Sequence, residues 1–281
     1  MSSMRNRVLM RWTLGTAILV GCLLVPTMSQ ASSLPKVTVA ITPSSATVGG
    51  SLESGAVNVV VSDTGVKEGS VILLQVKPGV TVAEVEAFAS SKKANGDPNK
   101  SSAVGSLVFD VEANPGALTE AQTVLAPGEY VVLTGEGEKP VQLRSHFKVI
   151  ASKAPAALPA PAAVERTIEF GFKGPKTLHD GELVAFENEG FLVHMDFAFP
   201  VKNMKAAKAA VRDLQSGREK GLGKLIAGPP VSFAGPLSHG AVQEETITAK
   251  PGIYVQVCFM QTQDGRDHTR LGMVRIIKIT K

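Results

Sequence analysis

Short β-patterned runs of mostly hydrophobic residues recur along most of the chain, and clusters of glycine, proline and aspartate separate these runs. Residues 182–187, 252–258 and 274–279 are examples. Short apolar runs bounded by turn residues are typical of β-strands, whereas a helix needs a longer pattern with a period near 3.6. The chain is also poor in aromatic residues and rich in valine, glycine and threonine. The pattern predicts an all-β protein built from antiparallel β-sandwiches.

Two segments depart from the strand pattern and show helical spacing. Thr81 and Glu84 form the sequence signature of a capping box, which marks the start of a helix. Apolar residues then recur every three or four positions in both segments, at Val82, Val85 and Phe88 in the first and at Met204, Ala207, Val211 and Leu214 in the second. We expect one short helix after residue 81 and another from 203 to 215, each covering one side of a sandwich.

An alanine- and proline-rich stretch at residues 151–163 divides the chain. It has no periodic apolar face, and its prolines favour an extended, semi-rigid spacer. The residues on either side are numerous enough for two small domains. We therefore predict a first domain at 32–150, a linker at 151–163 and a second domain at 164–281.

The two predicted domains share a sequence pattern. Residues 63–65 and 76–77 correspond to 188–190 and 201–202, and the motif Pro-Gly-x-Tyr at 127–130 recurs at 251–254. In both domains a predicted helix follows the second matched segment, which is 76–77 in the first domain and 201–202 in the second. The correspondence indicates a duplication, so the two domains are expected to share one fold.

Residues 1–31 have the features of a secretory signal peptide. Arg5, Arg7 and Arg11 precede an apolar run at 12–25 that is short for a membrane span, and Ser-Gln-Ala at 29–31 is a cleavage site. The mature chain would begin near Ser32. A second interpretation is a lipobox at 19–22, which would leave Cys22 lipidated as a membrane anchor. Both interpretations place the protein outside the cytoplasm, as a secreted, periplasmic or cell-envelope protein, and only the second attaches it to a membrane.

The charge of the chain changes when this segment is removed. The whole chain has 29 Lys and Arg against 25 Asp and Glu, for a formal net charge of +4. The signal segment contains three arginines and no acidic residue, so the mature chain is close to neutral. No basic stripe with interleaved aromatic residues remains, which argues against nucleic acid as a partner.

The second predicted domain contains one cysteine, Cys258, together with His194, His268 and Met273. A single cysteine in an oxidising compartment is buried, dimerised or bound to something. Two imidazoles, a thiolate and a thioether are the ligand types of a blue-copper site, in which Met is the weak axial ligand. Zinc would also accept two histidines and a cysteine.

The order His…Cys…His-x4-Met, with the strand Gly252-x-Tyr254-x3-Cys258, resembles the cupredoxin family of the plastocyanin and azurin type. This resemblance implies two tandem cupredoxin-like Greek-key β-sandwiches, each with a short helical insertion. It also implies one copper ion, a role in electron transfer or copper handling, and a redox or copper-donor protein as partner. The ligands implied are His194, Cys258 and His268, with Met273 axial.

The first domain is expected to bind no metal. The duplication aligns the four candidate ligands with residues of other types, namely Gly69 for His194, Thr134 for Cys258, a position near Val141 for His268 and one near His146 for Met273. A metal-free packing or partner-binding module is the predicted role of this domain.

The loop between Cys258 and His268 allows two structures. If Asp264 and Gly265 form a two-residue hairpin turn, Gln261 faces His268, and His268 lies roughly 10 Å from Cys258 along the ladder. That regular hairpin excludes His268 from a site with Cys258, whereas an irregular or bulged loop returns it. His239 is then the substitute ligand if His268 is out of reach, and His179 is expected at the surface.

No His-x-His pair occurs in the chain, and copper enzymes of the multicopper oxidase and nitrite reductase types need such clusters. Glycine-rich phosphate loops, nucleophile elbows and zinc-type cysteine pairs are also missing. We therefore expect a protein that is not an enzyme. The alternative to a copper protein is a metal-free β-sandwich that acts as a binding or structural module of the cell envelope.

Overall fold

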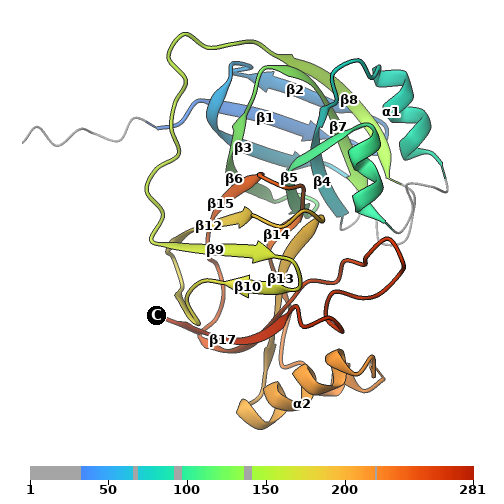
Figure 1. The fold of residues 1–281 in the computed structure, drawn as a ribbon. Coiled ribbons are helices and arrows are strands. Elements are labelled where there is room, and N and C mark those ends of the chain that lie inside the picture. The colour runs from blue at the N-terminus through green and yellow to red at the C-terminus, as the bar shows by residue number, and fades with distance from the viewer. Residues whose placement is uncertain (1–32, 66–68, 92–96, 136–140, 219) are drawn as a thin grey trace, which may run out of the picture. The chain divides into compact units, whose positions relative to one another are not determined.

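The computed structural model describes residues 33–65, 69–91, 97–135, 141–218 and 220–281, and the predicted signal peptide lies outside them. Strands dominate the described residues and form three sheets (Figure 1). The prediction of an all-β protein is confirmed.

The first half of the chain forms a two-layer sandwich. One layer has the strand order β2-β1-β3-β6 and the other has the order β5-β4-β7-β8. Strands β1 and β3 are parallel, and the other neighbours in these layers are antiparallel. The elements are β1 (Lys36–Ile41), β2 (Ala46–Gly50), β3 (Gly55–Asp63), β4 (Gly69–Val76), α1 (Val82–Ala89), the 3-10 helix η1 (Pro98–Ala103), β5 (Gly105–Ala113), β6 (Leu118–Leu125), β7 (Gly128–Gly135) and β8 (Gln142–Val149).

The second half repeats this order. Its layers are β10-β9-β12-β15 and β11-β17-β16-β13-β14, and β9 and β12 are again parallel. Among the described residues, the strand added in the second half is the short edge strand β11. The elements are β9 (Ala163–Ile168), β10 (Gly171–Lys173), β11 (Thr177–His179), β12 (Leu183–Asn188), β13 (His194–Val201), α2 (Met204–Gln215), the 3-10 helix η2 (Leu222–Lys224), β14 (Val231–Leu237), β15 (Val242–Thr246), β16 (Gly252–Val257) and β17 (Val274–Thr280).

One sheet continues from the first half into the second. Strand β6 pairs with β15 through Gln122 and Thr123 opposite Glu244 and Gln243, which makes an eight-stranded sheet (Figure 1). Residues 33–281 accordingly form one compact unit. The division into domains at 32–150 and 164–281 stays a prediction.

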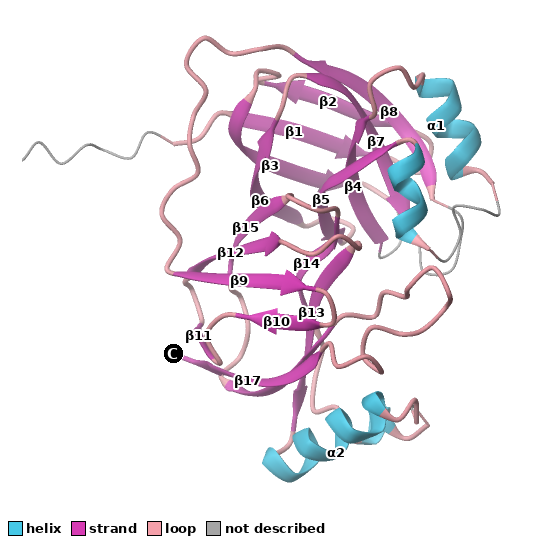
Figure 2. Cartoon of the chain, viewed as in Figure 1, coloured by secondary structure: helices cyan, strands magenta, loops and turns pink. Residues whose placement is uncertain are grey.

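Each half has an inner and an outer hydrophobic cluster. The inner clusters fill the space between the two layers of each sandwich, around Phe109 and Tyr130 in the first half and Phe186 and Phe233 in the second. The outer clusters lie on the other face of the β4 and β13 layers, under the helices. Helix α1 contacts β8, and α2 contacts β16 and β17 (Figure 2). A helix therefore covers one side of each sandwich, as the sequence pattern predicts.

The local signals for both helices are confirmed. Thr81 caps α1, accepting a bond from the Glu84 N–H while the Glu84 carboxylate accepts one from the Thr81 N–H at 2.7 Å. Asn203 caps α2. On α2 the predicted apolar face is buried at Ala207 and Leu214, whereas Met204 at its first turn is exposed. Within the described residues no helix is both long enough and apolar enough to cross a membrane.

The alanine- and proline-rich stretch at 151–163 runs along both halves. Its Ala156 carbonyl accepts a hydrogen bond from the Ala56 N–H at 2.9 Å, and its Ala162 N–H donates to the Leu183 carbonyl at 2.8 Å. Gly55 makes room for this stretch, because a Cβ there would lie 2.8 Å from the Ala156 nitrogen. The stretch is thus tied to the sandwiches rather than free in solvent.

The two tyrosines of the chain occupy equivalent places in the two halves. The Tyr130 hydroxyl donates to the Ala126 carbonyl at 2.9 Å, and the Tyr254 hydroxyl donates to the Lys250 carbonyl at 2.8 Å. Each bond ties the start of a central strand, β7 or β16, to the turn before it. Burial raises the pKa of Tyr130 to about 12, so the hydroxyl stays a donor across the usual pH range.

We expect Tyr130→Phe and Tyr254→Phe each to lower the free energy of unfolding by about 1 kcal/mol, because each leaves a carbonyl without its donor. The two sites are in different halves, so the losses should add in the double variant. Urea unfolding followed by circular dichroism measures this. Wild-type stability in the double variant would contradict the role given to the two hydroxyls.

Candidate metal centre

His194 is the first residue of β13 and is buried. The turn before it is held by the buried side chain of Asn188. The Asn188 amide donates to the carbonyls of Leu192 at 2.8 Å and Leu237 at 2.7 Å, and its oxygen accepts from the Gly190 N–H at 2.9 Å. An asparagine that bonds its own downstream backbone is a standard way to fix a tight turn. The direction in which His194 enters the sandwich is set by this turn.

Cys258 and His268 are brought together by a loop that leaves the regular ladder. The turn has three residues rather than two, since the Thr262 N–H donates to the Arg266 carbonyl and Gly265 adopts a φ of 81°. Gln261 therefore pairs with Asp267 instead of His268. The His268 N–H then bonds the Met260 carbonyl at 2.9 Å, and the chain turns back so that its carbonyl accepts from the Met273 N–H. Of the two loop structures left open by the sequence, the irregular one is observed.

The ligand atoms of His194, Cys258 and His268 converge. The Cys258 Sγ lies 3.8 Å from Nδ1 of His194 and 3.4 Å from Nδ1 of His268, and the ligand atoms of the three residues all lie within 4.8 Å of one another. A metal ion bonded at about 2.3 Å to sulfur and about 2.0 Å to nitrogen would hold such atoms roughly 3.5 Å apart. Among the described residues, these three form the one group of His, Cys, Asp or Glu side chains spaced to hold a metal.

The two imidazoles do not have the partners that buried structural histidines usually have. Both rings are buried, and the Nε2 atoms of His194 and His268 have no hydrogen-bond partner among the described residues. The side-chain contact of each Nδ1 is the Cys258 sulfur. The two Nδ1 atoms and the sulfur converge, so an ion held between them would have these three atoms as its ligands. The donor set fits a copper ion.

Met273 faces the same side of the sheet as Cys258. Strands β16 and β17 are antiparallel with Val257 opposite Val274, and the Cys258 N–H donates to the Met273 carbonyl at 3.3 Å. Residues directly opposite each other point to the same face, with Cβ atoms about 5 Å apart. The Met273 side chain is fully buried. Its assignment as the axial ligand stays a prediction that this register supports.

Burial keeps all three converging side chains uncharged in the metal-free protein. It raises the pKa of Cys258 to about 12, against the opposing effect of the Met195 N–H, which donates to the sulfur at 3.4 Å. Burial also lowers the pKa of His194 to about 4, and it lowers the pKa of His268. Neutral imidazoles are the form that binds metals, so no proton competes at these rings at pH 7.

The tip of the β9–β10 hairpin covers the group. The Phe170 ring packs edge-on against the His268 ring, with centroids 5.4 Å apart. Phe170 adopts a φ of 59°, a left-handed conformation that costs a residue with a Cβ about 1–2 kcal/mol. The neighbouring Glu169 carboxylate accepts hydrogen bonds from the N–H groups of Phe191 and Leu192, just before His194. Backbone strain persists where the surroundings enforce it, and here it places a ring over the site.

Gly190 lies next to the His194 ring and the Glu169 carboxylate. A Cβ at this position would lie 2.6 Å from Nε2 of His194 and 2.8 Å from a carboxylate oxygen of Glu169. Both separations are far below van der Waals contact. A side chain at residue 190 would therefore force the His194 ring and the Glu169 carboxylate to move.

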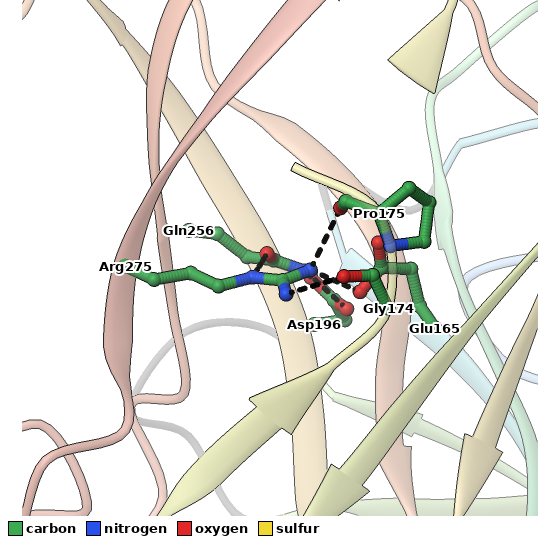
Figure 3. A network of polar contacts seen from close by, with 6 residues as sticks. All are labelled: Glu165, Gly174, Pro175, Asp196, Gln256 and Arg275. Carbon is green, nitrogen blue, oxygen red and sulfur yellow. Dashed lines mark hydrogen bonds and ion pairs between the residues drawn. The ribbon is translucent and has the colours of Figure 1, made fainter. Parts of the chain in front are cut away.

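Figure 3 shows a network of polar side chains that includes the buried Asp196 and Gln256 and the half-buried Arg275. Each of these three residues is two positions from a candidate ligand, so it shares a strand face with that ligand. Asp196 follows His194, Gln256 precedes Cys258 and Arg275 follows Met273. The Gln256 amide donates to both Asp196 oxygens at 2.7 and 2.6 Å, and Nε of Arg275 donates to Gln256 at 2.6 Å. These side chains form a polar layer that ties together the three strands from which the candidate ligands come.

Arg275 also binds β9 and the segment after β10. Its guanidinium forms an ion pair with Glu165 and donates to the Gly174 carbonyl at 3.2 Å and the Pro175 carbonyl at 3.3 Å (Figure 3). Two buried carboxylates thus share one cation. Burial raises the pKa of Glu165 to about 8 and that of Asp196 to about 7, in spite of Arg275. One of the two acids is therefore readily protonated near neutral pH.

The other histidines lie outside the group. His239, the substitute ligand considered above, bonds the Gly190 carbonyl through Nδ1 at 3.0 Å and stacks against the exposed Phe191 ring. His179 is exposed and contacts the Thr280 hydroxyl at 2.8 Å. The layer of Asp196, Gln256 and Arg275 was missed by reasoning from sequence. The spacing of two residues from each candidate ligand was the available signal.

Comparison with known proteins finds similarities among solved structures only. No protein-family model and no curated protein match the chain. Among solved structures the chain is similar to auracyanin B, with 17% identity, coverage of 44% of this chain and 93% of that one, and a TM-score of 0.27. It is also similar to a copper-containing nitrite reductase from Thermus scotoductus, with 13% identity, coverage of 88% of this chain and 67% of that one, and a TM-score of 0.25. A third similar structure is a blue copper oxidase from Nitrosomonas europaea, with 9% identity, coverage of 87% of this chain and 85% of that one, and a TM-score of 0.23. The all-β fold itself is shown by the strands and sheets of the described residues.

The expectation that the chain is not an enzyme is contradicted. A nitrite reductase and a copper oxidase are enzymes, and both occur among the similar structures. The missing His-x-His pair was therefore too weak a basis for excluding catalysis. At these TM-scores the likenesses carry no argument for a particular activity either.

We expect Glu165→Gln to make the stability of the metal-free protein less dependent on pH. A carboxyl whose folded pKa is raised stabilises fully below its unfolded pKa near 4.5, and this stabilisation is lost as the pH rises through about 8. Glutamine keeps the hydrogen bond to Arg275 and leaves one carboxylate, Asp196, for one guanidinium. Urea unfolding between pH 5 and pH 8.5 should show a smaller decrease for the variant, by a few kcal/mol.

The control for this measurement is Glu129→Gln, which removes a carboxylate from the exposed ion pair with Lys148. Exposed pairs contribute little, so this variant should follow the wild-type pH profile. Equal slopes for Glu165→Gln and wild type would show that Glu165 stays ionised beside Arg275 throughout the range.

Proposed function

We propose that the protein binds one copper ion through His194, Cys258 and His268, with Met273 as the weak axial ligand, and that it acts in electron transfer. The observation that carries this proposal is the convergence of one sulfur and two Nδ1 atoms in a buried space. A His2Cys set with a distant thioether is the ligand arrangement of blue-copper electron-transfer sites. When bound, copper would supply a one-electron redox couple.

Copper is favoured over zinc by the fourth side chain. Structural zinc sites are closed by a fourth cysteine, histidine or carboxylate. The side chain that faces Cys258 across the β16–β17 ladder is instead the thioether of Met273, a soft ligand that suits copper. A test with both metals is still needed, because zinc accepts two histidines and one cysteine.

The residues around the group are suited to holding the ligands still during electron transfer. Cys258 and His268 are fully buried, and the Met195 N–H is directed at the sulfur. Hydrogen bonds to a ligating sulfur and a dry surrounding shell both tune the reduction potential of a metal centre. The buried layer of Asp196, Gln256 and Arg275 restrains the three strands, so little rearrangement would accompany a change of oxidation state.

The proposal includes a location outside the cytoplasm and a redox protein or copper donor as partner. Its support is the signal-like composition of residues 1–31, which lie outside the described residues. Attachment to a membrane would require lipidation of Cys22.

We expect purified residues 32–281 to bind one equivalent of Cu(II) and to develop an intense visible band from the thiolate. Cys258→Ser should lose the band, because serine does not provide a soft thiolate ligand. Visible absorption and metal stoichiometry measure both. His239→Gln is the matched control and should behave as wild type, since this histidine lies on the neighbouring loop outside the group.

Weak binding that is equal in wild type and Cys258→Ser would refute the copper proposal. Cys258 would then be a buried core thiol, and the protein a metal-free β-sandwich module. Binding of zinc in preference to copper, measured in the same titration, would count against electron transfer.

Met273→Leu should keep the copper and change its reduction potential. Leucine preserves the buried volume but has no sulfur to donate, and loss of an axial donor destabilises Cu(II) more than Cu(I). We therefore expect a higher reduction potential, measured by redox titration of the visible band. An unchanged potential would show that Met273 is a packing residue only.

A further inference from the structure

Asn99 is a residue of the first half that reaches the candidate ligands of the second. It lies in η1, between α1 and β5, and is buried. Its Oδ1 accepts a hydrogen bond from the Val193 N–H at 2.6 Å, and its Nδ2 donates to the Gln261 carbonyl at 2.9 Å. Val193 directly precedes His194, and Gln261 lies in the loop between Cys258 and His268. One side chain thus connects the two segments that carry the candidate ligands.

The orientation of this amide is determined by its neighbours. Asp97, the cap of η1, accepts from both the main-chain N–H and Nδ2 of Asn99 at 3.0 Å. Lys100 pairs with Asp97 at 3.7 Å. A flipped amide would point its oxygen at a carboxylate and a carbonyl, and its NH2 group at an N–H. Each atom of the Asn99 amide can therefore make its contacts in one orientation only.

Apolar contacts accompany these hydrogen bonds. Val193 and Met260 belong to the outer hydrophobic cluster of the first half, together with side chains of α1, β4 and β7. One of them precedes His194, and the other follows Cys258 by two residues. The ligand-bearing segments of the second half are therefore packed into the outer cluster of the first.

The second half does not connect these segments by its own ladder. The pairing of β13 with β16 ends at Phe197 opposite Val257, short of both His194 and the 259–267 loop. The corresponding 3-10 helix of the second half, η2, has no side-chain cap. Asn99 bridges the segments just beyond the point where the ladder ends.

We propose that Asn99 is a positioning residue of the metal centre, and that the first half, which lacks the ligands, completes the site by clamping the two ligand segments. This inference rests on the proposed function. It gives the first half a definite role, namely holding His194 and the Cys258–His268 loop at the separation that the ion requires. Residues that support metal ligands from outside typically contribute 10-fold to 100-fold in metal affinity.

The test compares Asn99→Ala and Asn99→Leu with wild type in the chain of residues 32–281. Alanine removes both bonds and leaves space, whereas leucine removes both bonds at similar volume. Thr123→Val is the matched control, because the buried Thr123 hydroxyl also bonds across the halves, to the Val242 carbonyl at 2.8 Å, away from the ligand segments. Circular dichroism first establishes that all four proteins are folded.

Two measurements are made on each protein. Copper affinity is determined by competition with a chelator, and the visible band is recorded. Amide hydrogen exchange of the metal-free protein is followed at residue 193 and in 259–267. We expect both Asn99 variants to bind copper roughly 10-fold to 100-fold more weakly with a shifted band, and to exchange faster in these segments. Thr123→Val should match wild type in both.

The outcomes separate the two proposals. If wild type binds copper and the Asn99 variants match Thr123→Val in affinity, band and exchange, the clamp is overturned and the copper proposal stands. If leucine restores what alanine loses, volume rather than hydrogen bonding is responsible, which also overturns the clamp. If wild type binds no copper, the proposed function has failed by the wild-type result alone, and the role of Asn99 toward a metal is overturned with it.

Discussion

The structure around the candidate metal centre depends on the two-residue period of three adjacent strands. Side chains two residues apart on a strand share a face, so the ends of β13, β16 and β17 direct His194, Cys258 and Met273 to one side of the sheet. The same period directs Asp196, Gln256 and Arg275 to that side, one step further in. The candidate ligands are therefore the outermost layer of a stack, and the layer beneath them is polar and hydrogen-bonded. A register shift of one residue in any one of these strands would turn that strand's members of both layers to the other face of the sheet.

Burying such a polar stack is costly unless its members satisfy one another. The lower layer contains one guanidinium, one amide and two acids, of which one is readily protonated, and among its atoms Oε1 of Glu165 has no partner within the described residues. In the upper layer the thiol and the imidazoles are neutral, and the Nε2 atoms of both rings lack partners among the described residues. The upper layer differs from an ordinary core in the convergence of two Nδ1 atoms on one sulfur, and this convergence is the physical reason for expecting a ligand there.

The two halves differ in what they contribute. Their strand orders, helices and tyrosine bonds are the same, and one sheet runs through both. The second half carries the converging side chains, while the first supplies Asn99 and part of the apolar surface on which the ligand-bearing segments pack. In the second half the β9–β10 hairpin has an additional task, since the strained Phe170 at its tip covers His268.

Much of the architecture was contained in local patterns of the sequence. Short apolar runs bounded by turn residues are typical of strands, so the all-β class could be predicted, and the capping box at Thr81 and the spacing of 204–214 placed both helices. The residue types at 194, 258, 268 and 273 led to the prediction of a metal site. Contacts between distant segments could not be predicted in this way. Three such contacts join residues up to 162 positions apart. They are the approach of His268 to Cys258 through the three-residue turn, the hydrogen bonds of Asn99, and the charge that Arg275 shares with Glu165 and Asp196.

The sequence by itself therefore determined the strand pattern, the helix starts, the repeat and the ligand types, because each depends on near neighbours in the chain. The tertiary structure alone decided which of these side chains meet. That outcome depends on sheet register, on one extra residue in a turn and on packing between the two halves, and these are set by the total free energy of the folded chain rather than by any local pattern.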